Sequence, residues 1–579
     1  MIDRDDAMKR RSRSRLWRAF NLTFPIATAG VLALAPLARA AFRPPFIARR
    51  FVAATDHPDA SRAAASVLRS GGNAADGAIA AALALGVVNP ASSGFGGGGF
   101  ATLCTPQGQC TFIDFREVAP AALTADAIRN APDAAHASQI GGLAVGVPGE
   151  PAGLLDLSRR FGRISLSRTV APAVALARQG FAVSDYLAER VAIDRERLAN
   201  DGNLARLFLT DGAAVAAGVR VRRPRLAMAL ERYGSEGERF VHGAFAVAVA
   251  DAVRAAGGVL TAEDIRAYRP QERPVLSRTF RGVTVITAPP PSAGGLILLE
   301  ALAFIDGLPA SQLTHGSSTY DHALAEAWRG AFDDRARYIG DPGAQTSPVV
   351  DALLAPARIA QRRNAFDPAH ARPVVIIDPP HDHGTAHICV IDADGMMVSL
   401  TSTVNLSFGA RISVPGMDVV LNDQIDDFSL GTAVTNNYGL AAGIPNALAA
   451  GRRPISSMTP TILLRDGHPF ACIGASGGPR IATASTQALL NIVLHGMDPE
   501  AAVSSPRIHH QGTPDYMLVD RDVAEDVRAA LRARGYDVRE AERASPLAVV
   551  QAIVVRNRDG HREITAASDP RKGGLPAGE

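Results

Sequence analysis

A threonine that directly follows a glycine has the most distinctive chemical option in this chain. Thr385 lies between Gly384 and AHICVID, a run typical of a β-strand, and Thr403 follows eighteen residues later. A threonine hydroxyl can attack the preceding backbone carbonyl and leave the threonine at a new N-terminus. The freed α-amine then lies beside the hydroxyl as its general base. This arrangement predicts a self-cleaving chain whose nucleophile is Thr385.

Three other stretches offer groups that suit a zwitterionic amino acid. Arg116 supplies a guanidinium that can bind a carboxylate through two hydrogen bonds. Ser456 and Ser457 are adjacent hydroxyl donors, and Asn422–Phe428 (NDQIDDF) supplies acceptors for an ammonium group. Each stretch alone is typical of an ion pair, a helix cap or an Asx turn. Together with Thr385 they indicate an enzyme that binds both the carboxylate and the ammonium group of an amino acid.

The sequence GASGG around Ser476 offers a competing nucleophile. It matches the G-x-S-x-G elbow of α/β-hydrolases and lies between a predicted strand and a predicted helix, with His509 or His510 as a possible base. The region before it lacks the strand–helix alternation of a parallel sheet, which opposes this hypothesis. Gly477 and Gly478 have another use, because adjacent glycines at a helix start present backbone N–H groups to a developing oxyanion.

Two further patterns could indicate a bound metal or phosphate. His381, His383 and His387, together with Asp382, form a histidine-rich stretch, but their spacing matches no familiar zinc site. The glycine run 94–99 (GFGGGG) lacks the Lys-Ser/Thr of a phosphate-binding loop. We therefore predict no metal and interpret the glycine run as a tight backbone passage near a site.

Composition and pattern indicate a soluble α+β protein. The chain has 47% hydrophobic residues, and its net charge of +3 gives no reason to expect a nucleic-acid partner. Helical patterns fill residues 150–270 and strand patterns dominate from Thr385 onward, which points to an α+β or layered α/β architecture. The run from Phe51 to Pro90 predicts a strand and two helices. Other predicted strands are PVLSRTF with GVTVITA, HICVID, MMVSLTSTV, TPTILLRDG, HPFACIGA, LAVVQAIVVR and HREITAASD; other predicted helices are PAGLLDLSRRFG, VAPAVALARQG, LILLEALAFID, PRIATASTQALLNIVLHG and VAEDVRAALRARG.

Residues 1–40 are typical of a signal peptide. A basic stretch at residues 10–15 precedes an apolar run at about residues 19–38, and Ala38-Arg39-Ala40 places small residues where signal peptidase reads them. An uncleaved membrane anchor is the alternative, because about 20 apolar residues could span a bilayer. We expect cleavage after Ala40 and a periplasmic or secreted mature protein without a membrane span.

The four cysteines suit such an oxidising compartment. Cys104 and Cys110 flank a turn between two strand-like runs, so a local disulfide is plausible. Cys389 and Cys472 lie in apolar strands and are predicted to be buried free thiols.

In combination, these motifs resemble the γ-glutamyltranspeptidase (glutathione hydrolase) family of N-terminal-nucleophile hydrolases. The similarity runs from about Phe51 to Pro570. The motifs that carry it are GGNAADGAIA, NPASSGFGGGGF, DFREVAP, PPPSAGG, GTAH, TSTVNLSFG, NDQIDDF, NNYGL, RRPISSMTPT, GASGGPRI and ASDPR.

The resemblance implies a role for each matching residue. Thr385 matches the nucleophile, Gly384–Thr385 the autocleavage bond and Thr403 the threonine that orients the nucleophile. The remaining matches are Arg116, Ser456 and Ser457 for the substrate α-carboxylate, Asn405, Gln424 and Asp427 for its α-amine, Gly477 and Gly478 for the oxyanion, and Tyr438 for the lid loop that shields the pocket.

The resemblance also implies a fold and an activity. The fold is a four-layer αββα sandwich, in which a large chain (41–384) and a small chain (385–579) form a heterodimer with one core. The activity is γ-glutamyl transfer to water or to an amino acid or peptide through an ester on Thr385, with glutathione as a donor and no cofactor. Alternatives are a glutaryl or cephalosporin acylase, a poly-γ-glutamate hydrolase, or an unprocessed protein that only binds. The presence of Asp427 favours a donor with an α-amino group, and Tyr438 favours a small substrate.

Overall fold

The computed structural model describes residues 43–343, 348–372, 384–431, 435–543, 545–558 and 560–579. They belong to one compact unit, Phe42–Glu579. The predicted signal peptide, residues 1–40, lies outside the described residues. Among the described helices, every one is too short or too polar to cross a membrane.

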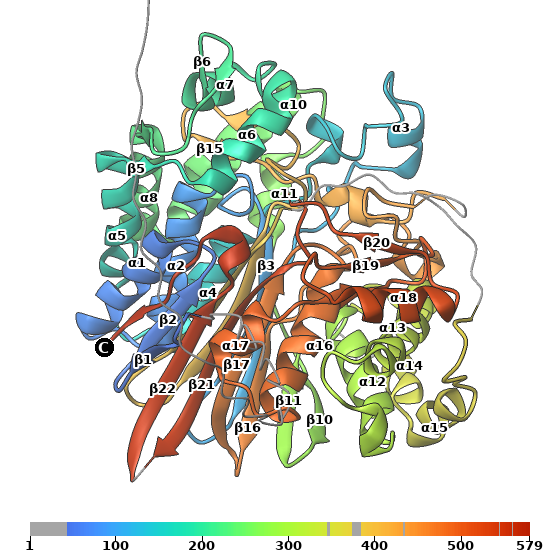
Figure 1. Cartoon of the computed structure of the whole chain (residues 1–579). Coiled ribbons are helices and arrows are strands. Elements are labelled where there is room, and N and C mark those ends of the chain that lie inside the picture. Colours follow the sequence, from blue (N-terminus) through green and yellow to red (C-terminus); the bar gives the residue numbers. More distant parts are fainter. Residues whose placement is uncertain (1–42, 344–347, 373–383, 432–434, 544, 559) are drawn as a thin grey trace, which may run out of the picture. The chain divides into compact units, whose positions relative to one another are not determined.

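Two seven-stranded antiparallel sheets stack at the centre of this unit (Figure 1). The inner sheet contains the Thr385 junction, and its strands in spatial order are β23 (Ala577–Gly578), β2 (Val52–Thr55), β12 (Ala386–Ile391), β13 (Met397–Thr403), β3 (Gly98–Cys104), β4 (Cys110–Phe115) and β9 (Gln271–Arg273). The second sheet is β1 (Phe46–Ala48), β22 (His561–Ser568), β21 (Val549–Arg558), β17 (His468–Ser476), β16 (Thr461–Arg465), β11 (Val283–Thr287) and β10 (Leu276–Phe280).

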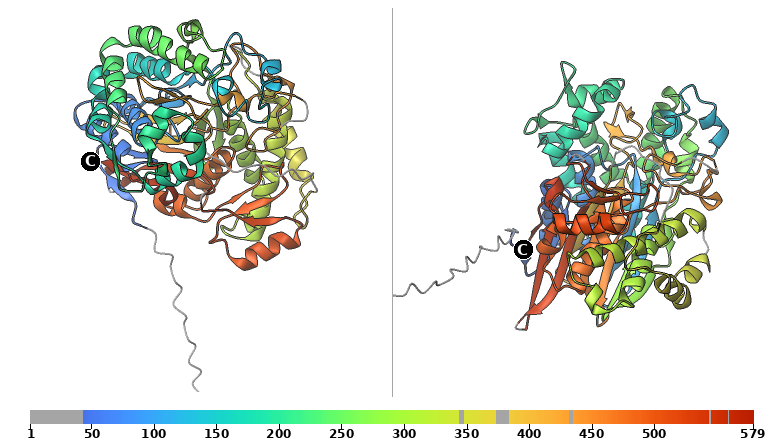
Figure 2. Two further views of the ribbon diagram at one scale, coloured as in Figure 1. Left: turned by 90° about the horizontal axis from the view of Figure 1, so that it is seen from above. Right: turned by 45° about the vertical axis from the view of Figure 1, so that its right-hand side comes forward.

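Helices cover the outer face of each sheet (Figures 1 and 2). Helices α1 (Pro58–Arg69), α2 (Ala74–Val88), α4 (Glu150–Phe161) and α5 (Leu166–Gln179) share an apolar core with the inner sheet. Helices α12 (Gly294–Asp306), α13 (Ser318–Tyr338) and α16 (Arg480–Val493) share another with the second sheet. A third apolar cluster lies between the sheets. The predicted α+β class and the four-layer αββα sandwich are therefore confirmed.

The central strands are buried on both faces because each has a sheet on one side and helices on the other. Every residue of β12 and β13 is buried. The sequence of β12 is therefore largely apolar, whereas β13 also buries the hydroxyl side chains of Ser399, Thr401, Ser402 and Thr403. Helix α2 is likewise buried almost all round, and a capping box of Asn73 and Asp76 fixes its start. The strands and helices predicted from the sequence all form at the predicted places.

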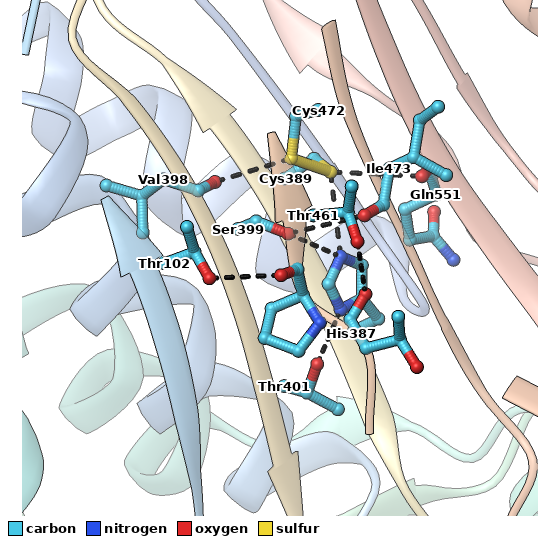
Figure 3. Close-up of a disulfide and its surroundings, with 12 residues drawn as sticks. Thr102, His387, Cys389, Val398, Ser399, Thr401, Thr461, Cys472, Ile473 and Gln551 are labelled. Carbon is cyan, nitrogen blue, oxygen red and sulfur yellow. Dashed lines mark hydrogen bonds between the residues drawn. A yellow bond between two sulfur atoms is a disulfide. The ribbon is translucent and has the colours of Figure 1, made fainter. Parts of the chain in front are cut away.

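All four cysteines of the sequence are paired in disulfides. The expected Cys104–Cys110 bridge closes the β3–β4 hairpin. The prediction that Cys389 and Cys472 are free thiols is wrong, because a disulfide joins them across the two sheets, from β12 to β17 (Figure 3). Their side chains meet only through the stacking of the sheets, which their separation of 83 residues does not reveal.

Candidate active site

The Gly384–Thr385 junction enters the inner sheet beside the end of β13. Two hydroxyl groups converge on the carbonyl oxygen of Gly384: Thr385 Oγ1 donates to it, and Thr403 Oγ1 donates to it at 3.1 Å. The two hydroxyl oxygens lie 3.1 Å apart. Asn405 N donates to Thr403 Oγ1 (2.9 Å), which orients that hydroxyl. The predicted nucleophile and its partner are thus brought together on the predicted cleavage bond.

Close packing explains why a glycine precedes Thr385. A Cβ at Gly384 would lie 2.7–2.8 Å from the carbonyl oxygens of Leu406, Ala91 and Asn405. Asn405 O also accepts a hydrogen bond from Gly384 N at 3.0 Å, which fixes the upstream side of the bond. The chain therefore clamps this peptide from three sides.

The glycine run 94–99 provides the tight passage that its sequence predicts. A Cβ at Gly97 would lie 1.9 Å from Thr403 O, and one at Gly96 would lie 1.9 Å from Val420 O. These glycines let neighbouring backbone approach Thr403 closely, as expected for packing next to the site.

A buried ion pair behind Thr385 was not predicted from the sequence. Lys572 Nζ donates to Thr385 O and to Asp56 Oδ2, both at 2.8 Å. Asp56 also accepts from Ser476 Oγ (2.7 Å) and Gln551 Nε2 (2.8 Å). This network fixes the downstream side of the junction. One signal for it exists in the sequence: Lys572 is one of only two lysines in a chain rich in arginine, the other being Lys9.

The same network bears on the alternative hypothesis that Ser476 is the nucleophile of a G-x-S-x-G elbow. Ser476 donates to Asp56, whereas His509 contacts Thr483 (2.8 Å) and Gln511 (3.0 Å). His510 Nε2 lies 3.4 Å from Asp515. Neither histidine is bonded to Ser476, so the described residues do not form a serine–histidine pair there.

The histidine-rich stretch is only partly described. His381, Asp382 and His383 lie outside the described residues. His387 is buried between the sheets, where its Nδ1 contacts Thr401 Oγ1 (2.8 Å) and its ring faces the Cys389–Cys472 disulfide (Figure 3). Burial lowers the pKa of His387 to about 3, so this imidazole is neutral at physiological pH.

The predicted residues of the carboxylate and ammonium sites line one pocket with Thr385. This pocket is lined by Arg116, Thr385, Thr403, Asn405, Gln424, Asp427, Tyr438, Ser456, Ser457 and Gly478, together with Arg335 and several apolar residues. Gly477 is adjacent, between the end of β17 and the start of α16. Arg335 had not been predicted from the sequence.

Arg116 and Asp427 are in direct contact, with 2.6 Å between Nη2 and Oδ2. This suits a zwitterion, because the α-carboxylate and the α-ammonium group are attached to the same carbon atom. The guanidinium donates hydrogen bonds to the carbonyl oxygens of Pro454 and Ile455 (3.3 and 2.9 Å). Arg116 itself directly follows the last residue of β4.

A second carboxyl beside Arg116 is electrostatically unusual. Glu117 is completely buried, and its two oxygens have no hydrogen-bond partner among the described residues. Burial raises the pKa of Glu117 to about 8, with the nearby Arg116 acting in the opposite direction. Glu117 is therefore mainly protonated at neutral pH, which leaves the charge of Arg116 available to Asp427 and to an anion in the pocket.

The side of the pocket that is predicted to bind an amine contains acceptors held by hydrogen bonds. Gln424 Nε2 donates to Asp427 Oδ2 (2.8 Å), while Gln424 Oε1 is buried without a partner in the described part of the chain. Tyr438, which also lines the pocket, donates from its OH to Asn405 Oδ1 (3.0 Å) and so orients that amide. Asn405 has a φ of 75°, a conformation that asparagine tolerates better than most residues.

The serine pair lies in the loop before β16, and the glycine pair lies between β17 and α16. Ser456 and Ser457 follow the Arg116-binding carbonyls, and Ser456 N donates to Pro291 O (2.9 Å). Gly477 and Gly478 have φ angles of 134° and 58°, values that favour glycine. The predicted substrate and oxyanion groups are thus grouped around Thr385.

A four-layer αββα sandwich with a threonine at the start of a central strand is the arrangement of N-terminal-nucleophile hydrolases, and this is the class that the fold defines. The sequence matches the gamma-glutamyltranspeptidase family over residues 60–578. The chain therefore belongs to that family.

Individual relatives align with this chain over nearly its whole length. The glutathione hydrolase proenzyme of Pseudomonas sp. (strain A14) is 35% identical, covering 92% of this chain and 95% of its own. The glutathione hydrolase proenzyme of Escherichia coli (strain K12) is also 35% identical and covers 91% of each chain.

Solved structures show the same likeness. The cephalosporin acylase from Bacillus halodurans superposes with a TM-score of 0.81 at 28% identity, covering 93% of this chain and 97% of that one. A chain of the γ-glutamyltranspeptidase from Helicobacter pylori gives a TM-score of 0.52 at 33% identity and covers 55% and 92%.

Proposed function

We propose that this enzyme is a glutathione hydrolase and γ-glutamyltransferase that cuts its own Gly384–Thr385 bond and then uses Thr385 as its nucleophile. The observation that carries the proposal is the convergence of the Thr385 and Thr403 hydroxyls on the carbonyl oxygen of the bond to be cut.

Maturation begins with attack of Thr385 Oγ on the carbonyl carbon of Gly384. Thr403 donates a hydrogen bond to the oxygen on which negative charge develops. The C–N bond breaks, the hydroxyl proton passes to the departing nitrogen of Thr385, and an ester joins the two residues. Water then hydrolyses this ester, giving a carboxylate on Gly384 and a free α-amine on Thr385. Lys572 holds the Thr385 carbonyl in place throughout.

Catalysis reuses the same hydroxyl on an external amide. Arg116, Ser456 and Ser457 would bind the α-carboxylate of the γ-glutamyl group, and Asp427, Gln424 and Asn405 would bind its α-ammonium group. This head-group binding positions the γ-carbonyl against Thr385 Oγ and removes much of the entropic barrier. The unpartnered Oε1 of Gln424 supports the ammonium site, because a buried acceptor is normally satisfied.

Attack on the γ-carbonyl produces an oxyanion that the Gly477 and Gly478 N–H groups would stabilise; loss of one such donor typically costs about 2.7–4 kcal/mol. The α-amine of Thr385 takes the hydroxyl proton and delivers it to the departing amine. The γ-glutamyl ester that remains on Thr385 is released by water, or passed to the amine of an amino acid or peptide.

Asp427 separates the γ-glutamyl hypothesis from the acylase alternative. A glutaryl group has no ammonium group, so it would leave this carboxylate facing an apolar chain, which disfavours its binding. Tyr438 in the lining of the pocket supports a small substrate rather than a polymer. We also propose that residues 1–40 direct export to the periplasm or beyond, and that the mature enzyme is a heterodimer of 41–384 and 385–579.

Denaturing electrophoresis of the purified protein tests maturation. Dividing 60.5 kDa by chain length predicts fragments of roughly 36 and 20 kDa, and Thr385→Ala is expected to remain a single chain. A single wild-type band that is identical to the Thr385→Ala band would show an unprocessed protein that only binds. Turnover of γ-glutamyl-p-nitroanilide and of glutaryl-p-nitroanilide then decides the donor. A preference for the glutaryl compound would overturn the role given to Asp427.

A further inference from the structure

Three side chains that can bind a metal ion meet between the two sheets. His387 and Cys389 lie on β12, Cys472 lies on β17, and all three are completely buried. A ring nitrogen of His387 and the two sulfur atoms all lie within 4.8 Å of one another. Figure 3 shows the imidazole pointing at the sulfurs. In the oxidised protein the sulfurs form a disulfide; reduction turns them into two thiols beside an imidazole.

The imidazole has the orientation of a histidine that binds a metal. Its Nδ1 lies 2.8 Å from Thr401 Oγ1, so an Nδ1–H can donate to that hydroxyl. Nε2 then carries its lone pair on the side of the sulfurs, 3.6 Å from Cys389 Sγ. A metal-binding histidine usually donates its other ring N–H to such a partner, which fixes the tautomer.

The second sheet leaves room for this ring. Gly474 lies on β17, and a Cβ there would clash with three atoms of the His387 ring, Nε2 among them. A glycine inside a strand often marks a place where another group approaches closely. Here the missing side chain lets the imidazole reach the two cysteines.

The distances within the cluster match a tetrahedral zinc site. With Zn–N of about 2.05 Å and Zn–S of about 2.3 Å, the nitrogen–sulfur edge of the tetrahedron is about 3.6 Å and the nitrogen–oxygen edge about 3.4 Å. Nε2 of His387 lies 3.6 Å from Cys389 Sγ and 3.3 Å from Ser399 Oγ. Zn²⁺ with two thiolates carries no net charge, which suits the apolar layer between the sheets.

We propose that the reduced chain binds Zn²⁺ through His387 Nε2 and the thiolates of Cys389 and Cys472, with Ser399 Oγ at the fourth position. Each thiol gives its proton to the solvent as its sulfur binds the ion. The sulfurs move apart to an edge of about 3.8 Å. Thiol–disulfide exchange with an oxidant that carries a disulfide then forms the Cys389–Cys472 bond and releases Zn²⁺, and the two electrons reduce the oxidant to thiols.

The ion joins the two strands that lead to the proposed catalytic groups. β12 begins directly after Thr385, and β17 ends directly before Gly477 and Gly478. Zn²⁺ thus cross-links the sheets of the reduced chain where the disulfide cross-links those of the oxidised chain. The inference does not depend on the proposed γ-glutamyl activity.

Metal binding to the reduced chain tests this proposal. The Thr385→Ala protein is reduced by a phosphine in denaturant, and refolded without oxygen in the presence of Co²⁺ or Zn²⁺. We expect about one ion per chain, with the visible bands of tetrahedral Co²⁺ and thiolate charge-transfer bands in the near ultraviolet. Addition of a disulfide oxidant is expected to release the ion. Oxidised protein that binds as much metal as reduced protein would show adventitious binding and overturn the proposal.

Two double variants locate the site. Cys389→Ser with Cys472→Ser is expected to abolish the cobalt bands, whereas the matched control, Cys104→Ser with Cys110→Ser, is expected to keep them. His387→Asn is expected to weaken binding by more than about 100-fold, the upper range for loss of an outer partner of a metal ligand. Bands that persist in the first double variant, or that vanish in the control, would overturn the proposal.

The control variant also gives a readout that survives if Cys389→Ser with Cys472→Ser fails to fold. The only thiols left in Cys104→Ser with Cys110→Ser are those of Cys389 and Cys472. Because a ligand of the folded state stabilises it by mass action, each tenfold increase in free Zn²⁺ should raise the thermal midpoint of this protein when it is reduced and not when it is oxidised. A midpoint of the reduced protein that does not respond to Zn²⁺ would overturn the proposal.

Discussion

At the scale of single residues, we expect the backbone around Gly384 to control the proposed self-cleavage. Three carbonyl oxygens surround the position that a Cβ would occupy. Gly384→Ala therefore has to move the junction away from Thr403, and overpacking of this kind costs about 1–3 kcal/mol. We expect self-cleavage to slow by about tenfold or more, since 1.4 kcal/mol is tenfold in rate. Denaturing electrophoresis over time after synthesis measures it.

Gly416→Ala is the control for that experiment. Gly416 lies downstream of the junction, and a Cβ there would meet nothing within 4 Å. It is expected to mature at the wild-type rate. If Gly384→Ala matured at the wild-type rate, the three surrounding carbonyl groups would have moved without cost, and they would not constrain the junction.

Glu117 makes stability depend on pH in a direction opposite to that of ordinary carboxylates. Its folded pKa of about 8 lies above its ordinary value of 4.5. Between these two pH values the folded protein binds a proton that the unfolded chain has lost, so stability falls as pH rises, by at most about 1.4 kcal/mol per pH unit. Glu117→Gln removes this contribution, and its stability relative to the parent should rise from pH 5 to pH 8.

Urea unfolding of Glu117→Gln and its parent at pH 5 and pH 8 measures the difference. Both should carry Thr385→Ala, so that a single chain unfolds. A difference between the two proteins that does not change with pH would show that Glu117 is already ionised in the folded state.

The sequence could predict most site residues because their motifs are local and their side-chain chemistry is specific. Arg116, Asp427 and Thr385 can be identified as candidates from their residue types and their neighbours in the sequence. Lys572 and Arg335 cannot, because their importance comes from burial and from what they face, which only the folded chain determines. Of these two residues, only Lys572 could have been noticed in the sequence, because it is a rare lysine in an arginine-rich chain.

At the scale of elements, the two disulfides close loops of very different length. Cys389–Cys472 closes a loop of 83 residues between the sheets, and Cys104–Cys110 closes one of six within a hairpin. Chain-entropy arguments give about 4.5 kcal/mol for the first and about 2 kcal/mol for the second. We expect Cys389→Ala with Cys472→Ala to lower the thermal midpoint of the Thr385→Ala protein more than Cys104→Ala with Cys110→Ala does. The reverse order would show that the hairpin bridge contributes more than loop length predicts.

Element prediction succeeded where the sequence pattern is unambiguous and failed where contacts join distant elements. Largely apolar runs identified β12 and β17 as strands, and both are mostly buried. The same reasoning made Cys389 and Cys472 inert, because strand assignment says nothing about which strands stack face to face. The four layers themselves followed from the resemblance to a family, whereas the residue pattern alone gave only a mixed or layered class.

At the scale of the whole molecule, the proposed cut divides a chain whose two parts are interleaved. In the inner sheet β12 of the small chain pairs with β2 of the large chain, and β13 pairs with β3 from Met397–Cys104 to Thr403–Gly98. In the second sheet β16 pairs with β11 and β22 pairs with β1, again across the two parts. Separating the fragments would expose both sheets and their apolar cores, and would also part the buried Asp56–Lys572 pair.

This interleaving predicts whether the two fragments stay together in native buffer and in denaturant. Under native conditions the fragments should elute together in size-exclusion chromatography, at the position of the unprocessed Thr385→Ala chain. In denaturant they should separate without any reductant, because each disulfide lies within one fragment: Cys104–Cys110 in the large and Cys389–Cys472 in the small. Fragments that part only after reduction would contradict this pairing of the cysteines. Fragments that elute apart in native buffer would show that the strand pairing across the cut does not survive it.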